Sequence, residues 1–245
     1  MQATNPRPVE WAYWLGRVLL YPLRPFFRIR TIGREHVPRR GPVLLAVNHI
    51  SLFDPVFVLW LGERTRRRVR FLAMAELWRT PVVRYFVAGT GQIPVERSSV
   101  GAVASLQPAE YALGAGECVC LFPEGGISPD LELRAGKTGI ARLAAASGVP
   151  VVPVGVWGTQ RVHAKGRRVR IRFGTALTMV VGEPVNVAPD DDPTAATDRI
   201  MGGVARCLAT AREVYPQTPS PRDDGWWVRG AETATARPSR DRTAT

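Results

Sequence analysis

Short apolar runs alternate with longer stretches of helical spacing along most of this chain. The runs are rich in Val, Leu and Ile and are closed by Pro, Gly or polar residues, a pattern typical of buried strands. Strands are predicted over 42–47, 69–73, 92–95, 118–122 and 150–156. Helices are predicted over 55–61, 81–88, 98–114, 139–147 and 194–214, with Pro108 kinking or splitting the third and Gly148 ending the fourth. This alternation predicts an α/β fold with a mostly parallel central sheet covered by helices on both faces.

One run differs from the others because charged and apolar residues alternate within it. The sequence RVRIRF at 168–173 predicts a half-exposed strand near an edge of the sheet.

The two ends of the chain have a composition unlike the middle. The segment 11–27 is aromatic at both ends and contains Arg17, Pro22, Arg24 and Pro25, so it is too interrupted to span a bilayer. It is typical of a helical segment lying in the lipid headgroup region, and a helix packed on the domain is the alternative; both roles are compatible. The tail 216–245 is rich in Pro, Ser, Thr and charge, which predicts disorder. The pair Trp226-Trp227 could dock on the domain or on lipid.

These boundaries predict three parts. They are an N-terminal membrane-interface segment (1–29), one α/β domain (30–215) and a disordered tail (216–245). A chain of 245 residues with 45% hydrophobic residues can bury one substantial core.

The charge balance favours anionic partners. Thirty-three Lys and Arg residues against 21 Asp and Glu give a net charge of +12, which suits acidic phospholipid, phosphorylated substrates or nucleic acid. No aromatic-basic motif or nucleic-acid module is present, so nucleic acid is not expected. Cys118 and Cys120 alternate within an apolar run, which predicts buried thiols in a reducing compartment rather than a disulfide or a metal site.

The stretch AVNHISLFD at 46–54 carries the candidate chemistry. His49 leaves a predicted strand at its carboxyl end, where a covered sheet gathers its reactive groups. Asp54 follows after four residues and can return beside the imidazole, fix its tautomer and stabilise its protonated form.

A structural interpretation of the same stretch has equal weight. Asp54-Pro55 is an ordinary helix start, with Asp as N-cap and Pro in the first turn, and Ser51 could compete for the capping role. His49 could simply satisfy a buried carbonyl.

Three further stretches, together with AVNHISLFD, resemble the four sequence blocks of the glycerolipid (PlsC-type) acyltransferase family in their usual order. AVNHISLFD is similar to the Asn-His-x4-Asp block. GQIPVER at 91–97, FPEGGIS at 122–128 and VVPVG at 151–155 resemble the second to fourth blocks, and KTG at 137–139 resembles a Lys-x-Gly step after the third. The resemblance covers about residues 30 to 180.

The resemblance implies transfer of a fatty acyl chain from a thioester donor, acyl-CoA or acyl carrier protein, to a glycerol hydroxyl. His49 would be the general base and Asp54 its orienting partner. The residues expected to bind substrate are Arg97, Glu124, Gly125, Gly126 and Lys137, with phosphate contacts from Arg97 and Lys137. No cofactor or metal is implied. The expected place of action is the cytoplasmic face of the cell membrane, as a peripheral or monotopic protein on an anionic surface.

Two departures from the family pattern concern phosphate binding. Gly126-Ile127 stands where Thr-Arg is usual, and Met74 stands where Lys is frequent. An arginine cluster could compensate or could face the membrane; its members are Arg64, Arg66, Arg67, Arg68 and Arg70. The expected acceptor is 1-acylglycerol 3-phosphate, giving phosphatidic acid, with glycerol 3-phosphate or another lysolipid as alternatives. A non-catalytic protein that binds anionic membranes is the alternative from another class.

Overall fold

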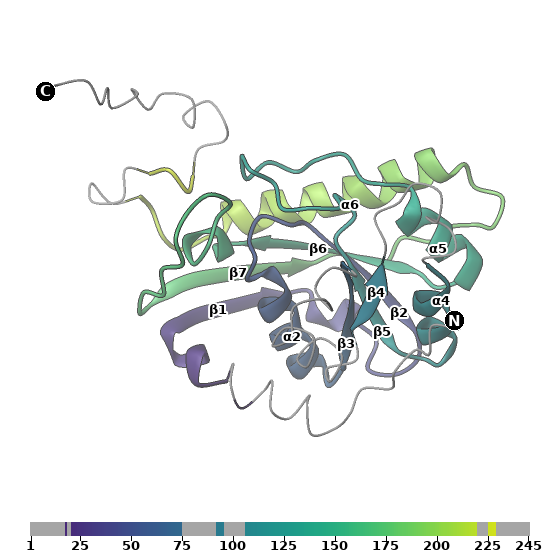
Figure 1. Ribbon diagram of the computed structural model, residues 1–245, viewed down its shortest axis with the longest axis horizontal. Coiled ribbons are helices and arrows are strands. Elements are labelled where there is room, and N and C mark those ends of the chain that lie inside the picture. Colours follow the sequence, from purple (N-terminus) through teal and green to yellow (C-terminus); the bar gives the residue numbers. More distant parts are fainter. Residues whose placement is uncertain (1–17, 19–20, 75–91, 96–105, 220–224, 229–245) are drawn as a thin grey trace, which may run out of the picture.

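The structure is a computed structural model that describes residues 18, 21–74, 92–95, 106–219 and 225–228. Within these residues the chain folds around one seven-stranded sheet of order β1-β7-β6-β2-β5-β3-β4 (Figure 1). The strands are β1 (Phe27–Ile32), β2 (Val43–Val47), β3 (Val69–Met74), β4 (Ile93–Val95), β5 (Cys118–Leu121), β6 (Val151–Trp157) and β7 (Thr175–Val181).

Five neighbouring strands, β6, β2, β5, β3 and β4, run parallel to one another. β7 pairs antiparallel to β6, and β1 pairs parallel to β7, so these two edge-side strands run in the opposite direction. The prediction of a mostly parallel sheet is confirmed. Because β2, β5 and β6 run in one direction, their carboxyl ends open at the same edge of the sheet, where ligands usually bind in such folds.

Helices cover both faces of the sheet, as predicted (Figure 1). Alternate residues of β2 divide between the faces: Leu45 and Val47 belong to the core under α2, whereas Leu44 and Ala46 belong to the core under the other helices. The helices are α2 (Asp54–Thr65), α4 (Gln107–Gly114), α5 (Gly139–Ser147) and α6 (Pro193–Glu213). All five residues of β2 are buried, which explains why its sequence is an unbroken apolar run.

The longest helix, α6, reaches β6 through a glycine. A Cβ atom added at Gly155 would lie 2.3 Å from the backbone of Cys207 and Leu208. Only a residue without a side chain allows the helix backbone to approach the strand so closely.

Most predicted elements are confirmed within one or two residues, although α2 extends four residues beyond its predicted end. Pro108 lies in the first turn of α4, where its missing N–H removes no helical hydrogen bond. Gly148 ends α5 with a φ of 63°, as expected. The predicted helix at 81–88 and the first part of the one at 98–114 lie outside the described residues.

The predicted strand at 168–173 is wrong. These six residues have no regular structure and are exposed, and the next residues, Thr175–Val181, form β7 instead. β7 is buried along its whole length between β1 and β6, whereas RVRIRF would have had to bury three guanidinium groups to take its place.

The predicted boundary between residues 29 and 30 is also wrong. It falls inside β1, which sequence analysis did not predict and which follows directly on a 3-10 helix, η1 (Tyr21–Phe26). Phe27 faces the core and stacks edge-on with Phe57 of α2, at 5.6 Å between ring centroids. Most of the segment 11–27 lies outside the described residues. No helix in the described part of the chain is long and apolar enough to cross a membrane.

Part of the tail is ordered against the domain. Trp227 is 2% exposed, and its carbonyl accepts a hydrogen bond from Nε2 of Gln160 at 3.2 Å. The guanidinium carbon of Arg161 lies 4.3 Å from the Trp227 ring centroid, and that of Arg167 lies 3.8 Å from the Trp226 centroid. The predicted disorder therefore does not hold for residues 225–228, and the Trp pair docks on the domain.

Candidate active site

The two candidate catalytic residues meet at the carboxyl-end edge of the sheet. His49 follows β2, and Asp54 is the first residue of α2. Nδ1 of His49 lies 2.9 Å from Oδ2 of Asp54, so the short loop between the strand and the helix brings the side chains into hydrogen-bond contact.

Asp54 holds the loop as well as the imidazole. Its Oδ2 accepts hydrogen bonds from the backbone N–H groups of Ile50 and Ser51, both at 2.8 Å, and the residue is fully buried. The N-cap position of α2 is Phe53, and no side chain caps the helix; Ser51 Oγ instead accepts from Phe53 N–H at 3.0 Å. The N-cap interpretation of Asp54 is thus wrong, because its carboxylate points back to the loop rather than into the helix.

This hydrogen-bond pattern assigns the imidazole tautomer. Backbone N–H groups can only donate, so Oδ2 of Asp54 is an acceptor, and Nδ1 of His49 is the donor in the third bond. In the neutral ring the other nitrogen, Nε2, then carries the free lone pair. With 15% of its side chain exposed, His49 is buried enough to be held and open enough to be reached. The alternative in which His49 satisfies a buried carbonyl does not hold.

The strand-end loop after β5 holds the backbone of His49 on both sides. His49 N–H donates to Oε1 of Glu124 at 2.7 Å, and His49 carbonyl accepts from Ser128 N–H at 2.7 Å. The ring of Phe122 stacks on the imidazole with 4.1 Å between centroids and an interplanar angle of 21°. These contacts fix both the position and the plane of the ring.

Glu124 links the backbone of His49 to the backbone of Arg134. Its second oxygen, Oε2, accepts from Arg134 N–H at 3.1 Å, and the residue is 5% exposed. Burial raises the pKa of Glu124, while the hydrogen bonds from His49 and Arg134 oppose the rise. Each oxygen accepts one hydrogen bond from the chain's own backbone, so Glu124 positions the loop that carries His49, and its predicted contact with substrate stays a prediction.

The structure brings Gly125 and Lys137 together, as the sequence blocks suggest. Gly125 has a φ of 71°, and a Cβ atom there would lie 2.6 Å from Cε and 2.8 Å from Nζ of Lys137. Lys137 is held at this point because its N–H donates to the carbonyl of Pro123 at 2.9 Å. At Gly126 an added Cβ would meet no heavy atom within 4 Å, so the side of the loop beyond the lysine is open. An ammonium group over a glycine turn can bind an anion.

A protein-family model described as "Acyltransferase" matches residues 28–157, slightly more than half of the chain. The chain belongs to the acyltransferase family. The match spans β1 to β6 and includes His49, Asp54, Glu124 and Gly125, so the family region is the part of the fold that builds this site.

Two relatives of this acyltransferase-family chain are both named 1-acyl-sn-glycerol-3-phosphate acyltransferase. A 1-acyl-sn-glycerol-3-phosphate acyltransferase of Chlamydomonas reinhardtii is 28% identical over 197 residues, covering 78% of this chain and 58% of the relative. One from chloroplasts of Arabidopsis thaliana is 27% identical, covering 68% and 46%. The chain thus spans about half the length of these relatives.

A solved structure shares the fold. The 1-acyl-sn-glycerophosphate acyltransferase PlsC of Thermotoga maritima is 25% identical with a TM-score of 0.63, covering 86% of this chain and 81% of that one.

Two predicted phosphate-binding regions do not add to the described site. Arg97 lies outside the described residues. Arg67 donates to the carbonyls of Pro38 and Gly116, and Arg70 forms an ion pair with Glu117 at 2.7 Å. These contacts lie before β2 and β5 and at the start of β3, at the edge of the sheet opposite His49, so the expectation that the arginine cluster compensates at the site is wrong for these two.

Asn48 is a site residue whose role sequence analysis missed. Its Nδ2 donates to the carbonyl of Val156 at 3.0 Å, and its Oδ1 accepts from Val156 N–H at 2.6 Å, with the side chain fully buried. It therefore continues the β2–β6 pairing by one residue and fixes the point at which His49 leaves the sheet. The signal was present in the sequence, since an Asn directly after five apolar strand residues needs buried partners.

The cysteine thiols take no part in this chemistry. Cys118, Cys120 and Cys207 are free and buried, as predicted for the first two. Burial raises the pKa of Cys118 to about 12 and that of Cys120 well above its usual value, so both are protonated and unreactive. Across the described ranges no group of three His, Cys, Asp or Glu side chains is placed to hold a metal ion.

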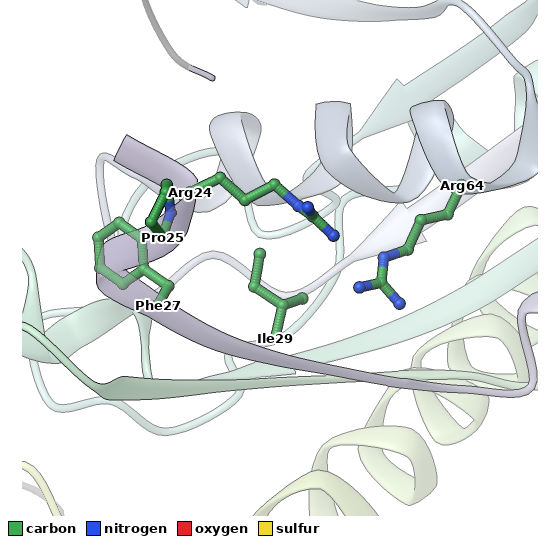
Figure 2. Close-up of a pocket in the computed structure, with 5 residues that line it drawn as sticks. All are labelled: Arg24, Pro25, Phe27, Ile29 and Arg64. Carbon is green, nitrogen blue, oxygen red and sulfur yellow. The ribbon is translucent and has the colours of Figure 1, made fainter. Parts of the chain in front are cut away.

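A separate pocket of about 220 Å³ lies between η1, β1 and α2. Figure 2 shows Arg24 and Arg64 pointing toward one another above Ile29, with Pro25 and Phe27 completing the wall. Burial lowers the pKa of Arg64, and the neighbouring charges of Arg24 and Arg34 lower it further. Arg64 belongs to the arginine cluster, but none of the residues expected to be catalytic or to bind substrate lines this pocket, so it is distinct from the site around His49.

Proposed function

We propose that this chain is an O-acyltransferase that moves a fatty acyl group from a thioester to the free hydroxyl of 1-acylglycerol 3-phosphate, giving phosphatidic acid. The observation that carries the proposal is the His49–Asp54 hydrogen bond of 2.9 Å, with Nε2 left as the free acceptor at the mouth of the site. The names of the relatives support 1-acylglycerol 3-phosphate as the acceptor. An imidazole that is held through its ring, N–H and carbonyl while one ring nitrogen stays free favours acid–base chemistry over a purely structural role.

The reaction needs one proton acceptor and no covalent enzyme intermediate. His49 Nε2 takes the hydroxyl proton as the acceptor oxygen attacks the thioester carbonyl carbon, and Asp54 stabilises the imidazolium that forms. The tetrahedral intermediate collapses, the carbon–sulfur bond breaks, and the leaving thiolate receives the proton from His49. The products are the new ester and a free thiol, and such acid–base help contributes roughly 10²–10⁴-fold in rate.

Lys137 is the described cation best placed for the acceptor's phosphate. Its ammonium group lies over Gly125, next to the loop that holds His49. We propose that Arg97 also binds this phosphate, and the support for Arg97 is its sequence block alone. Gly126 leaves room beside the lysine, so a phosphate with its glycerol can lie along the open side of the turn. Glycerol 3-phosphate or another lysolipid would place its phosphate in the same way.

The donor and the place of action remain expectations from sequence. Acyl-CoA and acyl carrier protein are both acidic partners that suit a net charge of +12. The reaction joins a lipid to a lipid, so we propose that the protein works bound to the anionic cytoplasmic face of the cell membrane.

The full chain, purified in detergent, tests this directly. Radiolabelled acyl-CoA and acyl carrier protein are offered with 1-acylglycerol 3-phosphate, glycerol 3-phosphate and uncharged lysolipids, and phosphatidic acid is measured. His49→Ala should abolish transfer, whereas His36→Gln, which removes an imidazole bonded to the Val181 carbonyl, should keep it. Turnover retained by His49→Ala would defeat the mechanism, and a preference for another acceptor would change the substrate only.

A further inference from the structure

The connection from β6 to β7 exposes apolar side chains to solvent. Val169 is 53% exposed, Ile171 is 40% exposed and Phe173 is 80% exposed. Arg170 and Arg172 lie between them and Arg168 precedes them, and all three arginines are exposed as well. We call residues 168–173 the basic-apolar loop. Isolated exposed apolar residues are common, but three at alternate positions of one loop form a patch that indicates a binding surface.

The patch extends beyond the loop to the end of η1. Phe26 is 40% exposed and packs edge-on against Phe173, with 6.0 Å between ring centroids. Gly174 N–H donates to the carbonyl of Phe26 at 2.8 Å, which fixes the end of the loop beside the start of β1. The aromatic pair is therefore part of one surface made by two distant segments of the sequence.

The base of the loop is anchored, so the patch is presented on a firm support. Arg170 N–H donates to the carbonyl of Val162 at 2.8 Å, and Arg167 N–H donates to that of Ala164 at 2.9 Å. The guanidinium of Arg167 lies 3.8 Å over the ring of Trp226. The alternating arginines and apolar residues of the loop are all exposed to solvent.

The charged residues that flank the loop in the sequence are all basic. No Asp or Glu occurs from residue 133 to residue 182, a stretch that contains nine Lys and Arg residues. The segment around Phe26 continues this pattern with Arg17, Arg24 and Arg28 and has no acidic residue from 11 to 34. Such a surface attracts anions over a Debye length and repels other cationic surfaces.

The loop opens on the same side of the sheet as the site. β2 and β6 run parallel, and His49 follows one carboxyl end while the connection to the loop follows the other. Figure 1 shows the connection between β6 and β7 at the left end of the view, beside the start of β1. A partner bound to the loop would therefore lie at the edge to which lipid substrates must come.

We propose that the basic-apolar loop and Phe26 form the surface by which the folded domain docks on an anionic phospholipid bilayer. Val169, Ile171 and Phe173 enter the boundary between headgroups and acyl chains, while the arginines between them pair with lipid phosphates. Two of its four exposed apolar side chains, Val169 and Ile171, are aliphatic and offer no ring on which bases can stack, so the surface fits a bilayer better than a nucleic acid. The choice of partner rests on the proposed function, but the docking itself can be measured without catalysis.

The first experiment measures vesicle binding by the full chain. Flotation is carried out with vesicles of phosphatidylcholine alone and with 30% phosphatidylglycerol, at about 0.1 M salt. Ile171→Ser/Phe173→Ser should weaken binding to the anionic vesicles roughly 10-fold or more. The matched control is Tyr111→Ser, which removes a side chain that is 67% exposed on α4 and should bind as the parent does.

The second experiment detects contact at the loop itself, because the N-terminal segment could also hold the protein on vesicles. Phe173→Cys is labelled with an environment-sensitive fluorophore; the native thiols are buried and stay unlabelled. Anionic vesicles should shift its emission to the blue, and a label at Tyr111→Cys should not respond. Arg170→Ala/Arg172→Ala should lose the preference for anionic vesicles, whereas Arg39→Ala/Arg40→Ala, before β2, should keep it.

The outcomes separate docking from catalysis. Unchanged flotation of the serine variant together with no blue shift at residue 173 overturns the proposal. DNA binding is measured by gel shift at the same salt, and a serine variant that loses DNA binding but keeps vesicle binding also overturns it. Loop variants should keep full turnover on substrate dispersed in detergent micelles. If no acyl transfer is seen with any acceptor but the loop still docks, the proposed function fails and the docking surface remains.

Discussion

The loops that follow β2 and β6 leave the same edge of the sheet and are built on opposite principles. In the first, the carboxylate of Asp54 takes three hydrogen bonds at one oxygen, and His49 is bonded through its ring, its N–H and its carbonyl. In the second, the base is anchored while Ile171 and Phe173 make the surface. Acid–base chemistry needs a side chain fixed to within a fraction of an ångström, whereas docking on a fluid bilayer needs accessible area and charge.

The largest expected break in this comparison comes from Asp54→Asn. The amide keeps the size of the carboxylate but cannot stabilise an imidazolium, and its NH2 group competes with the donors that Oδ2 now receives. We expect kcat to fall roughly 10²–10⁴-fold with little change in KM. Steady-state kinetics in detergent check this. Asp190→Asn, which changes an exposed carboxylate, is the control, and equal rates for the two variants would remove Asp54 from the mechanism.

The next largest effect concerns the two lysines of the chain. Lys137→Ala should raise KM for a phosphorylated acceptor roughly 10–100-fold, because a charge-assisted contact to phosphate is lost. Lys165→Ala, on the approach to the basic-apolar loop, should leave KM unchanged in micelles. Acceptor titrations with both variants check the difference. If Lys137→Ala lowered kcat and left KM unchanged, Lys137 would contact the transition state rather than the bound headgroup.

Glu124→Leu tests how strongly the loop that carries His49 is held, because the substitution should lower the free energy of unfolding. It leaves the N–H groups of His49 and Arg134 without their buried acceptor, which costs about 1–3 kcal/mol of unfolding free energy. Because burial raises the pKa of Glu124, the folded state holds that proton more tightly than the unfolded chain. Proton binding by Glu124 therefore stabilises the folded state. This stabilisation is complete below the pKa of the unfolded chain, near 4.5, and is lost as pH rises through the higher pKa of the folded state.

Urea unfolding of the parent and of Glu124→Leu at several pH values between 4 and 8 measures this effect. The stability gap between them should therefore narrow as pH rises through the raised pKa. Glu213→Leu, at the exposed end of α6, should show no such change of gap with pH. A gap that widens with pH would mean that the two backbone hydrogen bonds outweigh burial at Glu124.

The smallest effect is expected from Phe122→Leu. The variant keeps an apolar contact but loses the ring stacked on His49 at 4.1 Å, and such pairs contribute about 0.5–1.5 kcal/mol, so kcat should fall about 2- to 10-fold. Phe173→Leu should leave kcat in micelles unchanged, because that ring supports nothing at the site. Single-turnover rates with saturating donor compare the two. Equal losses of kcat in the two variants would contradict the conclusion that one loop serves catalysis and the other serves docking.

Elements with a local reason were accessible from sequence. The unbroken apolar run before Asn48 predicted β2 because a strand covered on both faces needs no polar residue. The His49–Asp54 spacing was equally readable, since the strand, the turn and the helix start that join the two residues are adjacent in the chain. The resemblance in sequence blocks then separated the catalytic interpretation from the capping one, which local rules favoured equally.

The errors share a different cause. RVRIRF has the better strand pattern and TALTMVV the poorer one, yet Thr175–Val181 became β7 because β1 and β6 offered it partners on both sides. β1 was hidden in an arginine-rich stretch for the same reason, because its partner lies almost 150 residues later. The hydrogen bonds from the N–H groups of His49 and Arg134 to the two oxygens of Glu124 were not predicted either, because these three residues meet only in the folded chain.

The sequence by itself determined the α/β class, the buried strands and the pairing of an imidazole with a carboxylate five residues later, because each depends on neighbours in the chain. Only the tertiary structure decided which nitrogen of His49 is free, that Glu124 accepts the N–H of His49, and that Phe26 and Phe173 share one surface. Those facts depend on hydrogen bonds and contacts between segments that are distant in sequence. Local propensity contains no information about them until the sheet has brought the strand ends together.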